Sequence, residues 1–385
     1  MRRPARGITS HPESTHQTPN SRETKSVEYT GRDMSHVTSL LVVLLTAANL
    51  FAQAPAGSQN LSPAALATRA KVQNVPEIPY ESVPNFFKMP ANLYLGEGIG
   101  IATNSKGHIF VYTRSQRTRL FEFDQNGNFV REIGEGLYGF VFAHAVRVDP
   151  QDNIWAVDEG SNMVIKFNPQ GRVVMTLGRR PEPADAALPS PAPDPANPGK
   201  YIFNRPTDVG WDADGNIFVT DGYGNSRIVK YDKRGRFITQ AGTRGSEPGQ
   251  LNLPHSMAMD AKGNAYVADR SNRRIQVFDN DLKFKAIYDN VGTPWELCIS
   301  PGPHQYLFSS NTFPDNNDYT LAGVTGEVYK MELDGTVVGK FGKAGKQWGE
   351  FSGLHEIDCR NPDVLYVSEI QLWRAQKLIL HPSGR

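Results

Sequence analysis

The sequence predicts an all-β protein, a six-bladed β-propeller with four antiparallel strands in each blade. Three observations favour this fold class. One strand–turn–strand pattern recurs six times, its apolar and polar residues alternate as in half-buried strands, and Gly (35) and Pro (27) are frequent enough for many tight turns. Four short strands per unit, repeated around an axis, form a propeller.

The repeat begins with an apolar-x-apolar run that leads to Asp or Asn. A Gly or Asn turn follows, and then a second β run that ends near Asp. The six copies occupy residues 101–112, 146–158, 209–221, 257–269, 297–309 and 357–369. The fifth copy is irregular, so a ring of five or seven blades is the rival interpretation. The recurring aspartates are interpreted as turn and strand-end structure rather than as catalysts; they are Asp149, Asp158, Asp212, Asp221, Asp260 and Asp269.

A third strand such as 227–232 follows each copy, and a Gly-led fourth strand such as 235–242 usually completes the blade. The last copy lacks a convincing fourth strand. We expect residues 85–94 to supply it, because a strand from the amino end would close the ring and remove an exposed edge.

The amino end is predicted to lie outside the propeller. Residues 34–56 combine an apolar run, too short to span a bilayer, with small residues near its end, which is the pattern of a signal peptide. A lipidated or uncleaved anchor is the alternative. Residues 1–33 are interpreted as disordered or as preceding the true start, 57–84 as a linker and 85–385 as the propeller. We expect a secreted or periplasmic protein with no membrane span after signal removal.

The charge balance argues against two classes of partner. The chain has 41 Lys and Arg residues against 40 Asp and Glu, a net charge of +1, with no block of like charge. Nucleic acid and anionic membranes are therefore not expected partners. We expect a monomer. Two cysteines, Cys298 and Cys359, lie in strand-like runs; in an exported protein they form either a disulfide or two buried thiols.

Histidines occupy one equivalent position in alternate repeats. The residues two places before the start of each copy are, in order, Ile99, His144, Thr207, His255, Trp295 and His355. First strands start at one rim of the channel, so histidines from repeats two, four and six would lie at three-fold positions around the axis. Three such imidazoles bind a borderline metal, zinc above all, and leave a coordination position open. Three rim histidines bonded to neighbouring carbonyls are the alternative.

The ends of the second strands share this rim and supply three candidate catalytic residues. Arg114 and Arg270 end the second strands of repeats one and four, and Tyr223 follows that of repeat three. Two guanidinium groups can hold a carboxylate, and a tyrosine beside a metal and an arginine is predicted to have a lowered pKa and to act as a general base. Ordinary salt bridges and turn packing are the structural alternatives. Two long loops, 178–203 and 310–326, are expected to wall or cover a pocket on this face.

Several motifs together resemble one enzyme family. The runs FNRPTDV (203–209), DGYGNSRIV (221–229), FITQ (237–240) and GQLNLPHSMA (249–258) are similar to the catalytic propeller of peptidyl-α-hydroxyglycine α-amidating lyase, which is built from NHL repeats. The resemblance extends over about residues 95–380 and is thinnest in repeat five. It implies a zinc enzyme that splits a peptidyl-α-hydroxyglycine into a peptide amide and glyoxylate, and hence a peptide or small-molecule substrate with a carboxylate.

The resemblance also implies roles for individual residues. It assigns zinc to His144, His255 and His355, catalysis to Tyr223, Arg114 and Arg270, and a structural calcium to the backbone carbonyls of Ile101 and Val146 with the side chain of Glu356. The chain departs from the family pattern at three places. Glu356 stands where the family has aspartate, Gly353 replaces an active-site methionine, and Gly224 occupies the position of a disulfide cysteine.

Two other functional classes are kept as alternatives. One is a non-catalytic NHL propeller that binds protein or glycan on its rim. The other is a different propeller hydrolase or lyase, such as a calcium-dependent lactonase or a lyase of cyclic peptides. Those enzymes rely on carboxylates in the channel, whereas the mouth of this channel is predicted to offer mainly histidines.

Overall fold

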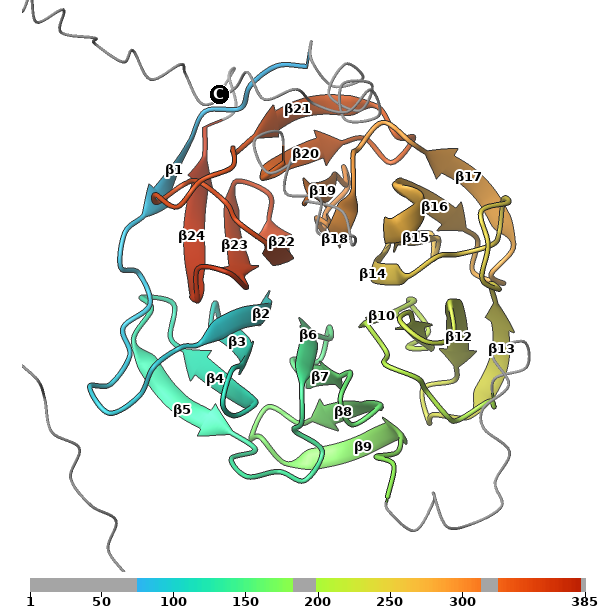
Figure 1. Cartoon of the computed structure of the whole chain (residues 1–385), viewed down its shortest axis with the longest axis horizontal. Coiled ribbons are helices and arrows are strands. Elements are labelled where there is room, and N and C mark those ends of the chain that lie inside the picture. Colours follow the sequence, from blue (N-terminus) through green and yellow to red (C-terminus); the bar gives the residue numbers. More distant parts are fainter. Residues whose placement is uncertain (1–74, 183–198, 313–324, 382–385) are drawn as a thin grey trace, which may run out of the picture. The chain divides into compact units, whose positions relative to one another are not determined.

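The computed structural model describes residues 75–182, 199–312 and 325–381. They form six four-stranded antiparallel sheets arranged around a central axis (Figure 1), which confirms six blades and excludes five or seven. The predicted signal peptide and most of both long loops lie outside the described residues. Within the ranges described, no helix is long and apolar enough to cross a membrane.

The first strand of each blade lies nearest the axis, and neighbouring first strands contact one another around the ring. They are β2 (Glu97–Thr103), β6 (Ala143–Val148), β10 (Asp208–Trp211), β14 (Pro254–Met259), β18 (Pro294–Ile299) and β22 (Leu354–Asn361). The second strands are β3 (Ile109–Arg114), β7 (Ile154–Asp158), β11 (Ile217–Asp221), β15 (Ala265–Asp269), β19 (Leu307–Asn311) and β23 (Val364–Glu369).

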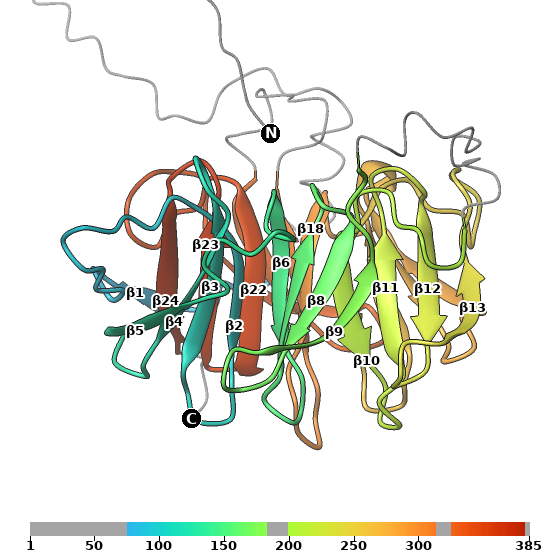
Figure 2. The ribbon, with the colours of Figure 1, turned by 90° about the horizontal axis from the view of Figure 1, so that it is seen from below.

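The third strands are β4 (Arg119–Phe123), β8 (Met163–Phe167), β12 (Arg227–Tyr231), β16 (Arg274–Phe278), β20 (Glu327–Met331) and β24 (Arg374–Leu380). The outer strands are β5 (Phe129–Ile133), β9 (Val173–Gly178), β13 (Phe237–Ala241), β17 (Phe284–Tyr288), β21 (Val337–Phe341) and β1 (Tyr80–Val83). One turn of 3-10 helix, η1 (Arg270–Asn272), follows β15. In the side view of Figure 2 the strands run between two faces, and the connecting loops form these faces.

Burial falls from the second strand to the outer edge of each blade. All five residues of β11 and of β15 are buried, whereas β13 alternates between half-buried and exposed positions. Inner strands pack against the sheets on both sides, as Trp155 does on Trp211 of the next blade with ring centroids 5.3 Å apart. The outer strand has a partner on one face only, which explains its alternation.

The recurring aspartates build turns and strand ends, as predicted. Oδ1 of Asp212 accepts the amides of Asp214 (3.0 Å) and Asn216 (2.9 Å) in the turn from β10 to β11, where Gly215 has a φ of 81°. At the end of β11, Asp221 accepts the amide of Asn204 at 2.8 Å and thereby anchors the loop that leads into its own blade.

The closing strand lies earlier in the chain than predicted. β1 pairs antiparallel with β24, from Tyr80 opposite Leu380 to Val83 opposite Lys377, and joins the two ends of the ring. The expected strand at 85–94 and the domain start at 85 are therefore corrected, because β1 falls within the supposed linker 57–84. The YESV strand is too short and polar to show a β pattern. The conspicuous aromatic residue Phe87 packs instead against Phe123, with ring centroids 5.0 Å apart.

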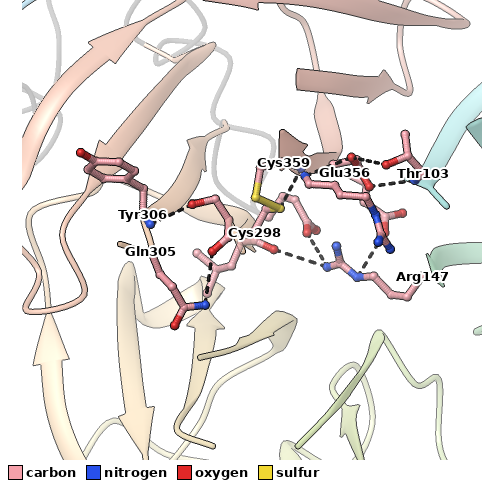
Figure 3. The surroundings of a disulfide bond; sticks show 12 residues. Thr103, Arg147, Cys298, Gln305, Tyr306, Glu356 and Cys359 are labelled. Carbon is pink, nitrogen blue, oxygen red and sulfur yellow. Dashed lines mark hydrogen bonds and ion pairs between the residues drawn. A yellow bond between two sulfur atoms is a disulfide. The ribbon is translucent and has the colours of Figure 1, made fainter. Parts of the chain in front are cut away.

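The two cysteines form a disulfide, a point that the sequence pattern did not decide. Cys298 of β18 and Cys359 of β22 join the first strands of blades five and six, with Cα atoms 6.0 Å apart (Figure 3). Cys359 is fully buried, whereas Cys298 is half-buried.

Candidate metal centre

The three predicted histidines meet at one rim of the propeller. His144, His255 and His355 are the second residues of β6, β14 and β22, and one ring nitrogen of each lies within 4.8 Å of the others. Within the described ranges they are the one group of three or more His, Cys, Asp or Glu side chains that converges in this way. The sequence prediction of their convergence is correct.

A β-bulge accompanies each histidine. The pairing of first and second strands shifts register between Ala143 and Ala145, between Pro254 and Met257, and between Leu354 and Glu356. A bulge inserts an extra residue and re-aims its side chain. Blades one and five have the same shift, so the bulge belongs to the repeat, and in blades two, four and six it accompanies a histidine.

Each imidazole is oriented by the next blade. Nδ1 of His144 lies 2.7 Å from the carbonyl of Thr207, Nδ1 of His255 lies 2.8 Å from that of Trp295, and Nδ1 of His355 lies 2.9 Å from that of Ile99. A carbonyl only accepts, so Nδ1 carries the proton and Nε2 presents its lone pair. The carbonyl contacts that the alternative interpretation proposed are therefore present, and they are also compatible with metal binding through Nε2.

The electrostatic surroundings keep the three imidazoles neutral. Burial is the main cause that lowers the pKa of His144, of His255 and of His355 well below 6.5. The positive charge of Arg270 lowers all three pKa values further, and that of Arg114 lowers those of His144 and His355. Neutral imidazole is the form that binds a metal. Nε2 of His255 is buried and has no hydrogen-bond partner among the residues described, which leaves a lone pair available to a metal.

The donor set fits zinc. Three neutral imidazoles with one open position are a common catalytic zinc arrangement. Bonds of about 2.1 Å in a tetrahedron would separate the nitrogens by about 3.4 Å. Since the nitrogens lie up to 4.8 Å apart, metal binding would draw the rings together.

Tyr223 lies beside this centre, as predicted. It follows β11, and its hydroxyl is 3.3 Å from Nε2 of His144 and 3.4 Å from Nη1 of Arg270. The guanidinium of Arg205 stacks over its ring at 4.3 Å. Burial raises the pKa of Tyr223, and Arg270 and Arg114 oppose this shift; the predicted lowering, which requires a bound metal beside the phenol, stays a prediction.

The two predicted arginines have different surroundings. Arg270 contacts Tyr223 and stacks on the ring of Trp295 at 3.9 Å. Arg114 instead forms ion pairs with Glu97 (3.0 Å) and Glu159 (3.3 Å). Two carboxylates thus already engage Arg114, whereas Arg270 faces Tyr223; a joint hold of both guanidinium groups on one substrate carboxylate stays a prediction.

Glu159 is a site residue that sequence reasoning missed. Its carboxylate is buried, lies 3.3 Å from both Arg114 and Arg205, and has a pKa raised by burial. It directly follows Asp158, at the rim end of the second strand in blade two. Arg114 and Arg270 were predicted from the equivalent position in their own repeats. The same position in repeat two could therefore have revealed Glu159.

The predicted calcium ligands are not arranged around a cation. Oε2 of Glu356 accepts the amides of Ile101 (3.0 Å) and Val146 (3.1 Å), and its Oε1 lies 3.3 Å from Nε of Arg147. Calcium binds oxygen atoms, whereas N–H groups face this carboxylate. These N–H and guanidinium contacts take up the Glu356 carboxylate and argue against a calcium ion there, although its Oε1 accepts no hydrogen bond from the residues described.

Two departures from the family pattern have a steric explanation. A Cβ at Gly353 would lie 1.4 Å from Oε1 of Gln371, and a Cβ at Gly224 would lie 2.1 Å from the side chain of Asn204. Neighbouring polar side chains occupy the space next to both glycines, so neither a methionine nor a cysteine fits there unless they move.

The fold and the site together define a six-bladed propeller with a three-histidine centre on one rim. The model of the NHL repeat matches residues 203–231 and 251–278. Human NHL repeat-containing protein 3 is 32% identical over 304 residues, which cover 74% of this chain and 80% of that protein. The chain belongs to the NHL-repeat family.

Its propeller also resembles an amidating lyase. A probable peptidyl-α-hydroxyglycine α-amidating lyase of Caenorhabditis elegans is 32% identical over 214 residues, which cover 49% of this chain. The match spans little more than half of that relative, 57% of its length. A gluconolactonase of Xanthomonas campestris has a TM-score of 0.53 at 14% identity, covering 81% of this chain and 92% of that one, which shows a shared fold alone.

Proposed function

We propose that the chain is a zinc-dependent carbon–nitrogen lyase of the peptidyl-α-hydroxyglycine α-amidating type. The observation that carries the proposal is the convergence of three Nε2 lone pairs, fixed by three carbonyl contacts, beside the hydroxyl of Tyr223. The lyase-like relatives support the reaction class. The proposed substrate is a peptide or small molecule that ends in an α-hydroxyglycine carboxylate.

The reaction breaks a carbinolamide into two products without oxidation or reduction. The carbinol O–H loses its proton, a C=O bond forms, and the electron pair of the C–N bond passes to nitrogen. The products are an amide and glyoxylate. Zinc held by His144, His255 and His355 would supply a Lewis acid for the carbinol oxygen.

Tyr223 is positioned to move the proton. Because burial raises its pKa, the phenol is protonated at neutral pH and can donate to the departing nitrogen. The carbinol proton can then restore the phenol. Arg270, 3.4 Å from the hydroxyl, opposes this pKa shift and stabilises negative charge on the phenol oxygen during the transfer.

Arg270 and Arg114 have different proposed roles. Arg270 stacks on Trp295 at the histidine rim and is the proposed partner of the substrate carboxylate. Arg114, held by Glu97 and Glu159, supplies positive potential that keeps the nearby imidazoles neutral. We assign Arg114 a positioning role, because its charge is already paired.

The test is metal analysis joined to an activity assay. Wild-type protein should hold about one zinc per chain and release glyoxylate from α-hydroxyhippurate. The double variant His144→Ala, His255→Ala should lose both properties. His304→Ala is the matched control, because His304 is exposed and contacts Glu332 away from the rim. If the folded wild type takes up no zinc when zinc is supplied, the lyase proposal is refuted and a non-catalytic binding propeller is favoured.

We also propose export to an oxidising compartment. The disulfide between Cys298 and Cys359 supports this proposal, because such bonds persist in secreted and periplasmic proteins and are rare in the cytosol. Fractionation of the cells that produce the chain, followed by detection of the protein outside the cytosol, tests it; a cytosolic protein with both thiols free would contradict it.

A further inference from the structure

A second cluster of charges lies deeper in the channel than the histidines. The guanidinium of Arg147, from β6, faces three buried carboxylates. Asp208 accepts from its Nε (2.9 Å) and Nη2 (2.6 Å), and Glu296 accepts from Nη2 at 2.5 Å. Glu356 lies 3.3 Å from Nε (Figure 3). The side chains of the three acids are exposed by only 1%, 4% and 1%.

This cluster connects all six blades through their first strands. Arg147 belongs to blade two, and Asp208, Glu296 and Glu356 belong to blades three, five and six. Backbone amides of two more blades also donate to these acids: Met257 of blade four donates to Oδ2 of Asp208 at 2.8 Å, and Ile101 of blade one donates to Oε2 of Glu356 at 3.0 Å. One cation thus stands at the centre of a network that spans the ring.

The arrangement has the properties of a cation site whose cation is a side chain. Three buried carboxyl groups from three blades surround one positive group, and they do not converge on a common point as the histidines do. Burying a carboxylate is costly unless a positive group or N–H donors compensate it. A calcium ion would need oxygen ligands in a space that the guanidinium fills.

We propose that Arg147 is the structural cation of this propeller and holds its first strands together in the place of a bound calcium ion. The inference does not depend on the lyase activity, since it concerns a cluster that the proposed mechanism does not use. It predicts a protein whose stability is indifferent to calcium and which contains no tightly bound calcium.

The first measurement uses the wild-type protein. After dialysis, elemental analysis should find less than about 0.1 calcium per chain, and the thermal midpoint should be the same in 1 mM EGTA and in 1 mM calcium chloride. About one calcium per chain, with a midpoint that falls when EGTA removes it, would overturn the proposal. Zinc content is measured in the same samples, so that a failure of the lyase proposal is recognised separately.

The second measurement removes the guanidinium. Arg147→Ala leaves three buried acids without their cation, so its midpoint should fall by about 10 °C. Calcium should then raise it by about 5 °C or more over EGTA. A recess of about 200 Å³, lined in part by Arg147, Met257 and Leu297, lies beside the cluster. A midpoint that does not respond to calcium would contradict a cation site.

Two further variants serve as controls. Arg172→Ala removes an exposed arginine of the same blade and should match the wild type in both buffers. Arg147→Lys keeps the charge but loses the planar fork, so its midpoint should lie between those of the wild type and Arg147→Ala. If Arg147→Ala does not fold, the calcium content of the wild type and the thermal midpoint of Arg147→Lys test the proposal instead. An Arg147→Lys variant as stable as the wild type would refute the role of the planar guanidinium.

Discussion

The disulfide between Cys298 and Cys359 allows a quantitative prediction. The bond joins residues 61 positions apart, and a cross-link of that span removes about 14 cal/mol/K of chain entropy from the unfolded state. At 25 °C this corresponds to about 4 kcal/mol. The double variant Cys298→Ala, Cys359→Ala should lose about this much stability.

Urea unfolding, followed by tryptophan fluorescence, measures the loss. With a slope of about 3 kcal/mol/M, a change of about 4 kcal/mol lowers the midpoint by about 1.4 M. Wild-type protein treated with a reductant is the matched control, since it loses the cross-link but keeps the sulfur atoms in the buried interface. Its midpoint should lie close to that of the double variant. Equal midpoints for oxidised wild type and double variant would refute the reasoning.

Three further predictions concern the site and the buried charges. Tyr223→Phe should keep the zinc content and lower kcat for glyoxylate release by about 10²–10⁴-fold, the usual contribution of a general acid–base group; unchanged kcat would remove Tyr223 from the reaction. Arg227→Met should lower the free energy of unfolding by about 3–5 kcal/mol, because Asp221 is fully buried and lies 2.9 Å from Arg227, whereas Arg236→Ala, 72% exposed, should change little. Burial raises the pKa of Glu296 from 4.5 to about 8, so the folded protein keeps a proton that the unfolded chain loses above pH 4.5. The free energy of unfolding should therefore fall as the pH rises from about 5 to 8, and Glu296→Gln should flatten that slope in a urea titration; an unchanged slope would contradict the assignment.

Periodicity made the blades and the histidine rim predictable from the sequence. The repeat shows where first and second strands lie, and a six-fold ring then places residues at equivalent positions on one rim. His144, His255 and His355 needed no further information, because three alternate copies carry histidine at the same place. The positions of Tyr223 and Arg270 were predictable in the same way, because the ends of the second strands lie on that rim.

Contacts between blades have no such periodic signal. The choice between thiols and a disulfide at Cys298 and Cys359 depends on the Cα separation of 6.0 Å across neighbouring blades. The ion pair of Arg114 with Glu159 likewise depends on how blades one and two pack, whereas Glu97 faces Arg114 across two strands of blade one.

The closing strand β1 and the guanidinium of Arg147 illustrate the same difference between features that repeat along the chain and contacts between distant residues. Repetition along the chain was enough to predict the fold class and the convergence of three imidazoles, and it favoured six blades over five or seven. The pairing of β1 with β24 and the contacts of Arg147 with the buried acids are evident only in the folded structure. Both depend on distances between residues far apart in the chain, which arise only when six blades close around one axis.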